Sequence, residues 1–246
     1  MDVGYSAAAS QFAAQREDMM RLNERAFGNR FMRGLIKIGG MERDFNSERL
    51  SSLLAGLKSF SNTLGEIERF SLASSTFLDR AFMAGQLHPS TATELAIVGP
   101  GARACGIPCD VRKQLAYGAY AHAGVNESLG TKGDALSRFM VKLNEVKESV
   151  RLINEETSRM QPGAVCASST PKPKAGSIAF GVCETPRGSV TMMLQAGKAG
   201  AIANLSIRTA SFRNWRAVEQ AVLGNIVADF PLVNKSFNLS YAGADL

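Results

Sequence analysis

Residues 46–67 read NSERLSSLLAGLKSFSNTLGEI, and this stretch has the clearest periodicity in the chain. Its apolar side chains recur at intervals of three and four residues: Leu50, Leu53, Leu54, Leu57, Phe60, Leu64 and Ile67. That spacing places them on one face of an α-helix, and Asn46 or Ser47 has the side-chain oxygen of a helix N-cap. The stretch therefore predicts a long amphipathic helix in a mainly helical protein.

Two other long helices are predicted on either side of this one. Residues 5–27 are rich in Ala, Met, Leu, Glu and Arg, and Gly28 stops them. The other helix follows Gly133-Asp134 and is closed by Gln161-Pro162-Gly163. Its predicted apolar face consists of Leu136, Phe139, Met140, Leu143, Val146, Val150 and Ile153.

The remaining segments predict shorter elements. Shorter helices are expected within residues 72–83, 90–99 and 215–227, an ordered loop over 103–120, and no regular period after Pro231. The runs 178–182, 189–194 and 202–207 are bounded by turn residues and predict a small antiparallel sheet. We therefore expect an α+β protein that is mainly α, a bundle of long helices with a small antiparallel sheet toward the C-terminus, forming a single domain over residues 1–246.

Composition excludes several classes of protein. The 246 residues are 45% hydrophobic and carry a net charge of +6, but basic residues alternate with acidic ones, so no nucleic-acid partner is expected. No apolar run approaches the roughly 18–20 residues of a membrane-spanning helix, and the first residues lack the layout of a signal peptide. Any membrane association is thus expected through partner subunits. Four cysteines without a regular framework suit a reducing compartment, with buried free thiols.

Few residue patterns indicate chemistry by themselves. Cys105 and Cys109 are three residues apart, but no second ligand pair accompanies them, so small buried residues are favoured over a metal site. His88 lies in a predicted turn and His122 in a predicted polar loop, and both are expected to be structural. The chain has no glycine-rich phosphate loop and no nucleophile triad.

Two loops contain charges that need partners. Arg103, Asp110 and Arg112 lie in a Gly/Pro-rich loop, where they either pair with one another or face a cleft. Glu184-Thr-Pro-Arg-Gly188 lies between two predicted strands. It is either a tight turn at Gly188 or a support that projects Arg187 rigidly into a pocket.

Four segments together resemble a known family: residues 98–112, residues 133–138 with Glu145, residues 184–188 and residues 237–245. In this order they resemble the large subunit of nickel–iron hydrogenases of the membrane-complex type, found in formate hydrogenlyase and energy-converting hydrogenases. The D subunit of respiratory complex I is related to that branch. The resemblance covers the C-terminal part of such a protein, whose N-terminal portion with its first cysteine pair has no counterpart here.

The resemblance also implies where a site would lie. Active hydrogenases end in D-P-C-x-x-C-T-D-R, whose cysteines ligate nickel and iron, and this chain has Ser240 and Gly243 at those two positions. A hydroxyl and a glycine cannot replace two thiolates, so no metal is expected. The Pro-Arg motif persists as Pro186-Arg187. The implied cavity residues are Arg103, Asp110, Arg112, Glu184, Arg187, Ser240 and Asp245.

The function implied is that of a subunit of a membrane-associated, hydrogenase-related or NADH:quinone oxidoreductase-like complex, whose metal-free cavity serves electron transfer, quinone or ion coupling. Arg187 and Arg112 would stabilise a reduced, anionic acceptor, and Glu184 or Asp110 would relay protons. The chain itself would hold no cofactor, with quinone as a candidate ligand. A small iron–sulfur subunit carrying the cluster and membrane-arm subunits would be its partners, at the cytoplasmic side of the inner membrane. The alternative is a non-redox scaffold subunit of the same kind of complex.

Overall fold

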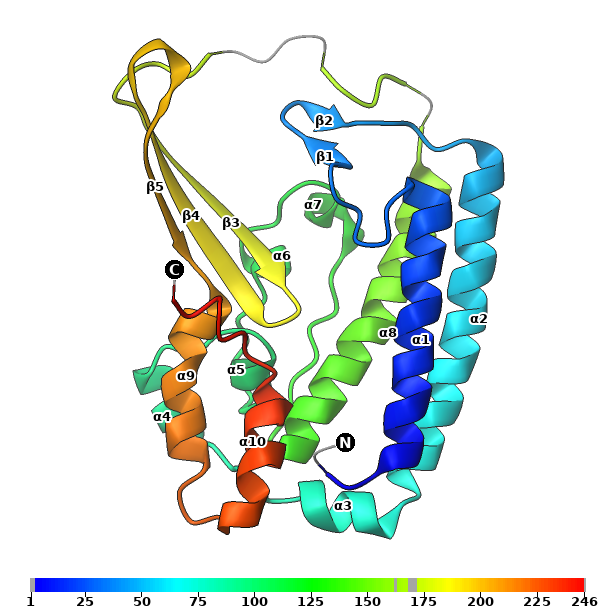
Figure 1. The fold of residues 1–246 in the computed structure, drawn as a ribbon, viewed down its shortest axis with the longest axis vertical. Coiled ribbons are helices and arrows are strands. Elements are labelled where there is room, and N and C mark those ends of the chain that lie inside the picture. Colours follow the sequence, from blue (N-terminus) through cyan, green and yellow to red (C-terminus); the bar gives the residue numbers. More distant parts are fainter. Residues whose placement is uncertain (1–2, 162, 168–171, 246) are drawn as a thin grey trace. The chain divides into compact units, whose positions relative to one another are not determined.

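The computed structural model describes residues 3–161, 163–167 and 172–245. Within these residues ten α-helices and two antiparallel sheets form, the larger sheet toward the C-terminus (Figure 1), which confirms the predicted fold class. The chain divides into two compact units. The first unit contains described residues of 3–77 and 153–172, and the second unit contains those of 78–152 and 173–245. The single domain over 1–246 stays a prediction.

The first unit is built on two long helices, α1 (Ser6–Phe27) and α2 (Ser47–Leu72), which pack along each other. Their predicted spans are confirmed, and the inward side chains of α2 are Leu53, Leu57, Leu64 and Ile67. The two helices approach closely at Gly56, because a Cβ there would lie 2.7 Å from the Leu22 side chain. Burial of this apolar face holds the pair together.

The ends of these helices follow from local capping. Gly28 has a φ of 76° and its N–H donates to the Glu24 carbonyl at 2.8 Å, which ends α1 in a left-handed cap. Asn46 precedes α2, and its side-chain oxygen accepts a hydrogen bond from the Arg49 N–H at 2.9 Å. Of the two predicted N-cap residues, Asn46 is therefore the one that caps the helix.

Replacing Asn46 by alanine should lower the free energy of unfolding of the first unit by about 1 kcal/mol, since one orphan N–H of α2 loses its acceptor. Urea denaturation followed by circular dichroism measures the change. Asn46→Asp keeps a capping oxygen and serves as the control. Equal losses in both variants would contradict the capping role.

A small hairpin also belongs to the first unit. Strands β1 (Ile36–Lys37) and β2 (Gly40–Met41) pair with Ile36 opposite Met41. The sequence predicted only a break at Gly39-Gly40, because two-residue strands are too short to show a period.

The core of the second unit is formed by apolar side chains, many of them small, from its helices and from the segments between them. Its buried members are Leu87, Ala92, Ile97, Ala102, Cys105, Ala217, Val218, Ala221, Val233 and Phe237. The helices of this unit, with α3 shared at its boundary, are α3 (Ser75–Ala81), α4 (Pro89–Glu94), α5 (Pro100–Ala104), α6 (Val111–Gln114), α7 (Tyr120–Ala123), α9 (Ala210–Ala221) and α10 (Phe230–Phe237), with 3-10 turns at Val227–Asp229 and Lys198–Gly200.

Four predictions for this unit are corrected. Residues 103–120 are not loop throughout, because α5 ends and α6 and α7 begin within them. The helix predicted over 90–99 ends at Glu94, and the one predicted over 215–227 runs from Ala210 to Ala221, since Thr209 caps its first turn. Pro231 does not end regular structure: it lies in the first turn of α10, where proline is tolerated.

Helix α8 (Ala135–Arg159) passes from the second unit into the first. Its predicted position is confirmed, but its predicted apolar face is only partly right. Leu143 is buried, whereas Val146 and Ile153 are exposed. Arg138 and Glu148 take buried positions instead, because each finds hydrogen-bond partners inside the protein.

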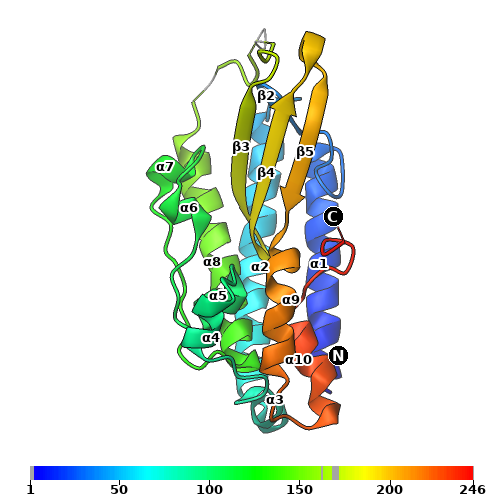
Figure 2. The same cartoon turned by 90° about the vertical axis from the view of Figure 1, so that its left-hand side faces the viewer.

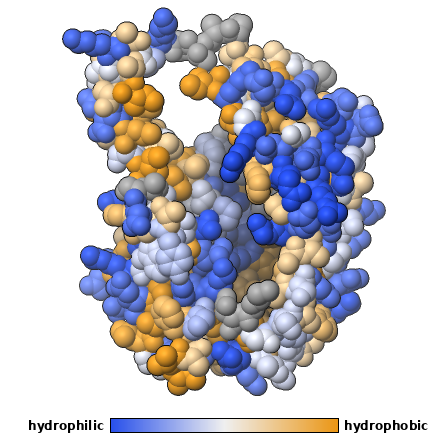
Figure 3. Space-filling view, viewed as in Figure 1, coloured by the Kyte–Doolittle hydropathy of each residue, from blue (hydrophilic) through white to orange (hydrophobic). Residues whose placement is uncertain are grey.

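The larger sheet has the order β3 (Ile178–Thr185), β4 (Gly188–Ala196) and β5 (Ile202–Arg208), all antiparallel. All three predicted strands are confirmed. Figure 2 shows β5 leading into α9, and Figure 3 shows hydrophobic side chains at the surface of the sheet region. Phe180 and Ile202 are among the exposed hydrophobic residues of its strands. Thr185 pairs with Gly188, so Pro186-Arg187 is a two-residue turn. This turn faces the functional residues described next.

Candidate functional site

Two backbone segments of the second unit meet at a pair of glycines. Gly99 has a φ of 71°, and a Cβ there would lie 2.3 Å from the Gly188 Cα. Asn214 on α9 is buried and fixes the same segment: its side chain accepts from the Val98 N–H at 3.0 Å and donates to the Val98 carbonyl at 2.9 Å. The start of α5 is thereby held against the Pro186-Arg187 turn.

Arg103 on α5 is fully buried and lies at the centre of an ion cluster. Its Nε donates to Glu145 at 2.6 Å and its Nη1 to Glu184 at 2.9 Å, while Asp110 lies 3.9 Å from Nη1. Burial opposes the cation, but the charges of Glu145 and Glu184 raise the pKa of Arg103. Arg103 Nη2 is buried without a hydrogen-bond partner among the described residues. We call Arg103, Asp110, Arg112, Glu145 and Glu184 the Arg103 cluster.

Asp110 and Arg112 form an ion pair with each other, which is one of the two alternatives that the sequence predicts for this loop. Arg112 donates from Nη2 to Asp110 at 2.6 Å and from Nε at 3.0 Å, and the Asp110 side chain also caps α6 through the Arg112 N–H. Burial alone would raise the pKa of Asp110, but the hydrogen bonds from Arg112 and the charge of Arg103 lower it. Asp110 therefore remains ionised in the cluster. Asp110 thus pairs with Arg112 inside its own loop and also lies 3.9 Å from Arg103 on α5.

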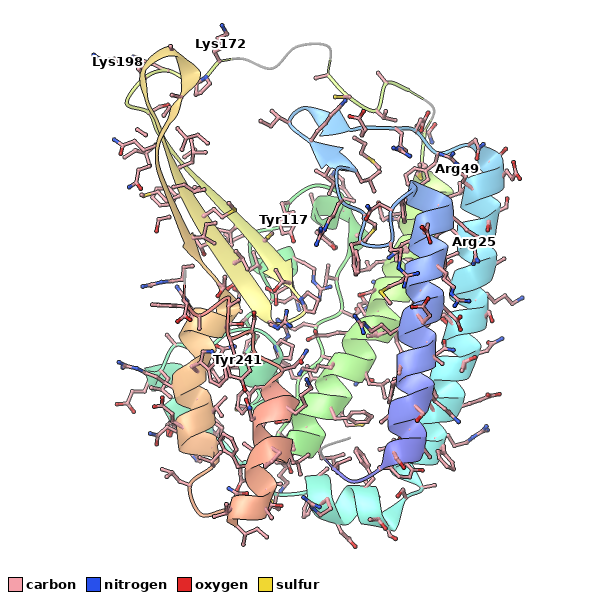
Figure 4. All side chains as sticks on the ribbon, in the orientation of Figure 1. Arg25, Arg49, Tyr117, Lys172, Lys198 and Tyr241 are labelled. Carbon is pink, nitrogen blue, oxygen red and sulfur yellow. The ribbon has the colours of Figure 1, made fainter. Side chains whose placement is uncertain are left out.

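Glu184 at the end of β3 is the carboxylate whose pKa moves the other way. Burial raises its pKa, although Arg103 works against that change. Its second oxygen accepts from the Val111 N–H at 3.3 Å, and its own N–H donates to the Tyr117 hydroxyl at 3.0 Å (Figure 4). The cluster has three carboxylates and two guanidinium groups, so a proton on Glu184 would balance its charge.

Arg187 contacts the chain's last turns rather than the Arg103 cluster. It is exposed, and its Nε donates to the Asn238 carbonyl at 2.6 Å. Residues 238–245, here called the terminal segment, then fold onto α9: the Ser240 N–H donates to Ser211 Oγ at 3.0 Å, and Thr209 Oγ1 donates to the Gly243 carbonyl. Tyr241 packs on Trp215, with ring centroids 5.1 Å apart, and is labelled in Figure 4.

Ser240 and Gly243, which occupy the two cysteine positions of the hydrogenase motif, are hydrogen-bonded to each other. Ser240 Oγ accepts a hydrogen bond from the Gly243 N–H at 3.1 Å, so the hydroxyl is used within the turn. Asp245 is exposed and has no hydrogen bond or ion pair within the described part of the chain. The structure thus brings Arg103, Asp110, Arg112 and Glu184 together. Arg187 is connected to the segment that contains Ser240 through its hydrogen bond to the Asn238 carbonyl.

Sequence reasoning missed several residues of this region. The resemblance includes Glu145 in a motif but not among the implied cavity residues, and Tyr117, Asn214 and Lys142 are not among the residues that it selects. A signal existed in part: Arg138, Lys142 and Glu145 follow each other at intervals of four and three residues, and charges in such a row on one face of a helix suggest internal pairing.

The cysteines do not form a ligand set. Cys105 is buried and its thiol donates to the Gly101 carbonyl at 3.3 Å, and burial raises its pKa to about 11. Cys109 and Cys166 are partly buried and Cys183 is exposed, so the expected burial holds for Cys105 only. Over residues 3–161, 163–167 and 172–245, no group of three His, Cys, Asp or Glu side chains could hold a metal ion.

Comparisons with known proteins define the class of protein first. This class consists of oxidoreductase subunits, and its members have complex I-like or hydrogenase-like names. Residues 2–176 match the family described as respiratory-chain NADH dehydrogenase, 49 Kd subunit. The chain belongs to this family.

Individual relatives carry both kinds of name. The NADH-quinone oxidoreductase D subunit of Akkermansia muciniphila is 27% identical over all of this chain and 66% of its own length. Carbon monoxide-induced hydrogenase of Rhodospirillum rubrum is 29% identical over 96% of this chain and 65% of its own length. The NADH-quinone oxidoreductase D subunit of Thermus thermophilus is 33% identical over 61% of this chain and 37% of its own. The chain therefore spans less than two thirds of the length of these relatives.

No helix that the structure describes has both the length and the apolar character required to cross a bilayer.

Proposed function

We propose that this chain is a component of a membrane-associated NADH-quinone oxidoreductase-type or hydrogenase-related complex, in the position that the D subunit occupies in the former. In this complex, the region between the Arg103 cluster and the terminal segment serves electron transfer to quinone or the coupling of that transfer to ion movement. The resemblance to hydrogenases implies that this region corresponds to their metal site. Family membership supports the class. One relative is named as an NADH-quinone oxidoreductase subunit and another as a hydrogenase, and these two names are the reason for proposing these two kinds of complex.

One observation carries the proposal: a buried, charge-rich cluster persists beside a terminal segment without thiolates. Arg103 is fully buried, yet two carboxylates bind it at 2.6 and 2.9 Å, and Glu184 among them is shifted toward its protonated form. Buried ionisable groups are costly, and such groups concentrate at functional sites.

The residues at the former ligand positions do not fit a nickel–iron centre. Ser240 Oγ accepts from the Gly243 N–H, and Gly243 has no side chain, so neither position offers the soft anionic ligand that such a centre needs. We accordingly assign no step to a metal. The charged side chains that remain would orient an acceptor and stabilise negative charge on it.

The partners follow from the same assignment. A small iron–sulfur subunit would deliver electrons, and membrane-arm subunits would bind the complex to the cytoplasmic side of the inner membrane. Quinone would be the ligand, and the chain itself would hold no cofactor. Hydrogenase activity is not part of the proposal.

Replacing Arg187 by alanine in the assembled complex should lower quinone reduction at least about tenfold, because a positive donor near developing negative charge is lost. The fold should tolerate this change, since Arg187 is exposed and makes one side-chain hydrogen bond. The measurement is quinone reduction by the purified complex, together with ion translocation in vesicles. Arg216→Ala, an exposed arginine on α9, is the matched control.

The same experiment separates this proposal from the alternative of a non-redox scaffold subunit. A scaffold would tolerate loss of the Arg187 charge, provided that the complex still assembles. Unchanged electron transfer and ion coupling in an assembled Arg187→Ala complex would therefore contradict the redox role and favour the scaffold.

A further inference from the structure

A row of three ionisable side chains on α8 lies beside the proposed site. Arg138, Lys142 and Glu145 are spaced by four and three residues, so they share one face of the helix. Arg138 is fully buried, and Lys142 and Glu145 are partly buried. Glu145 binds Arg103 at 2.6 Å, which connects the row to the Arg103 cluster. None of the roles given above uses Lys142.

Lys142 binds the C-terminal end of α10. Its Nζ donates to the Ser236 carbonyl at 2.5 Å and to the Phe237 carbonyl at 3.3 Å. These carbonyls are among the last four of the helix, which have no N–H partner within it, and a cation there also opposes the helix dipole. The next carbonyl, that of Asn238, accepts from Arg187. Two basic side chains from different elements therefore hold three successive carbonyls at the start of the terminal segment.

The other charges around Lys142 oppose its positive form. Arg138 on α8, Arg187 on the strand turn and Lys235 on α10 are nearby cations. Glu145 is the anion that favours the charged form, and it already binds Arg103. No carboxylate forms an ion pair with Lys142 in the described part of the chain. There, the Arg138 side chain donates hydrogen bonds to neutral groups, the Gly85 and Gly133 carbonyls and Ser236 Oγ, and its guanidinium lies 4.0 Å from the centroid of the Phe237 ring.

These surroundings set the proton affinity of the amine. Burial, followed by the charge of Arg138, lowers the pKa of Lys142 to about 7. An ordinary lysine has a pKa of about 10.4 and stays charged at neutral pH, whereas this amine is present in both forms. A negative charge arriving nearby favours the ammonium form and would draw a proton onto it.

We propose that Lys142 is the proton-carrying residue of this site: its amine binds a proton when negative charge reaches an acceptor near Arg187, and releases it when that charge leaves. The inference rests on the proposed function and names the residue that performs its coupling. An electron from the iron–sulfur donor adds one negative charge to the quinone acceptor. One N–H bond then forms on Lys142 Nζ as one O–H bond of a water molecule breaks, the resulting hydroxide leaves to solvent, and the lysine itself is neither oxidised nor reduced.

The charge state of Lys142 also has a structural consequence. The ammonium form donates charge-assisted hydrogen bonds to the two α10 carbonyls, and these are stronger than the bonds that a neutral amine donates. Protonation should therefore tighten the junction between α10 and the terminal segment. This gives a measurement that does not depend on electron transfer.

The test uses the assembled complex with three variants. Lys142→Met removes the titrating group, Lys142→Arg keeps a permanent charge, and Lys132→Met removes an exposed lysine of the same unit as the control. Proton uptake is measured with a pH indicator at pH 7 on reduction by a fixed number of electrons. Both Lys142 variants should lose up to about half a proton per chain relative to wild type, because an amine with a pKa near 7 is already half protonated at that pH. The Lys132 variant should match wild type.

Amide hydrogen exchange of residues 236–243 between pH 6 and 8 gives the second measurement. After correction for intrinsic rates, wild type and Lys132→Met should be more protected at pH 6 than at pH 8, and both Lys142 variants should lose this difference. If Lys142→Met misfolds, Lys142→Arg still decides the question. Unchanged proton uptake in either folded Lys142 variant overturns the inference. A wild-type complex that reduces no quinone contradicts the proposed function instead. In that case pH-independent protection of residues 236–243 in wild type still overturns the titration of Lys142.

Discussion

Replacement of Arg103 by methionine is expected to lower the free energy of unfolding of the second unit by about 3–5 kcal/mol, the scale seen when one partner of a buried ion pair is removed. Methionine keeps an unbranched apolar stem in place of the arginine stem and removes the guanidinium with its charge. Glu145 and Glu184 would lose their bonds of 2.6 and 2.9 Å, and Asp110 would lose a cation 3.9 Å away. Denaturant unfolding of the chain measures the effect.

The loss should depend on pH in a defined direction. Glu184, whose pKa burial already raises, would lose the cation that opposes this rise, so its folded pKa would lie further above its unfolded value. Between those two pKa values the folded variant binds more protons than the unfolded chain, so its stability falls as the pH rises. The variant should therefore be less impaired at pH 5 than at pH 8.

A half-exposed arginine of the same unit gives the control. Arg80 pairs with Asp229 at 3.3 Å, and Arg80→Met should cost at most about 1 kcal/mol, as for other exposed ion pairs. Similar costs for the two variants, or an Arg103→Met loss that does not change with pH, would mean that the Arg103 cluster is not a coupled buried network.

Replacement of Gly99 by alanine is the second change with a large expected effect, about 2–6 kcal/mol. Its φ of 71° and ψ of −154° lie in a region that is essentially restricted to glycine, which accounts for about 1–3 kcal/mol. The added Cβ would also meet the Gly188 Cα at 2.3 Å and the Arg187 carbonyl at 2.5 Å, both backbone atoms that cannot rotate away. Overpacking of this kind costs about 1–3 kcal/mol more.

The variant should also displace the Pro186-Arg187 turn, so quinone reduction should fall even where the complex still assembles. Gly181→Ala is the matched control, because a Cβ at that position of β3 has no atom within 4 Å. Thermal unfolding and quinone reduction of the two variants are the measurements. If Gly99→Ala matched Gly181→Ala in both, the close approach of the two glycines would have no functional weight.

Much of the fold could be predicted from residue order. The face of α2 and the three strands of the larger sheet were found because their side chains repeat at helical or strand spacing, which is a local property. The short helices α6 and α10 could not be predicted from the sequence, for a physical reason. They have four and eight residues, too few to show a period, and they are held by tertiary packing.

The candidate site divides in a similar way. Sequence patterns and resemblance selected Arg103, Asp110, Arg112 and Glu184, and the structure brings these four together. They did not select Lys142 or Asn214, because a helical lysine or asparagine has the same local pattern whether it faces solvent or an opposing backbone. Asp245 was selected by motif position alone, and the structure gives it no partner among the described residues.

The sequence by itself determined the long helices, the positions of the three strands of the larger sheet and the absence of thiolates at Ser240 and Gly243, since these depend on residue type and spacing along the chain. Only the tertiary structure decided which charges share a partner. Glu145 and Glu184 are separated from Arg103 by 42 and 81 residues, and both raise the pKa of its guanidinium because folding places their carboxylates within 2.6 and 2.9 Å of it, which no local pattern encodes. The same holds for Lys142, whose proton affinity is set by the carbonyls and cations that folding places around its amine.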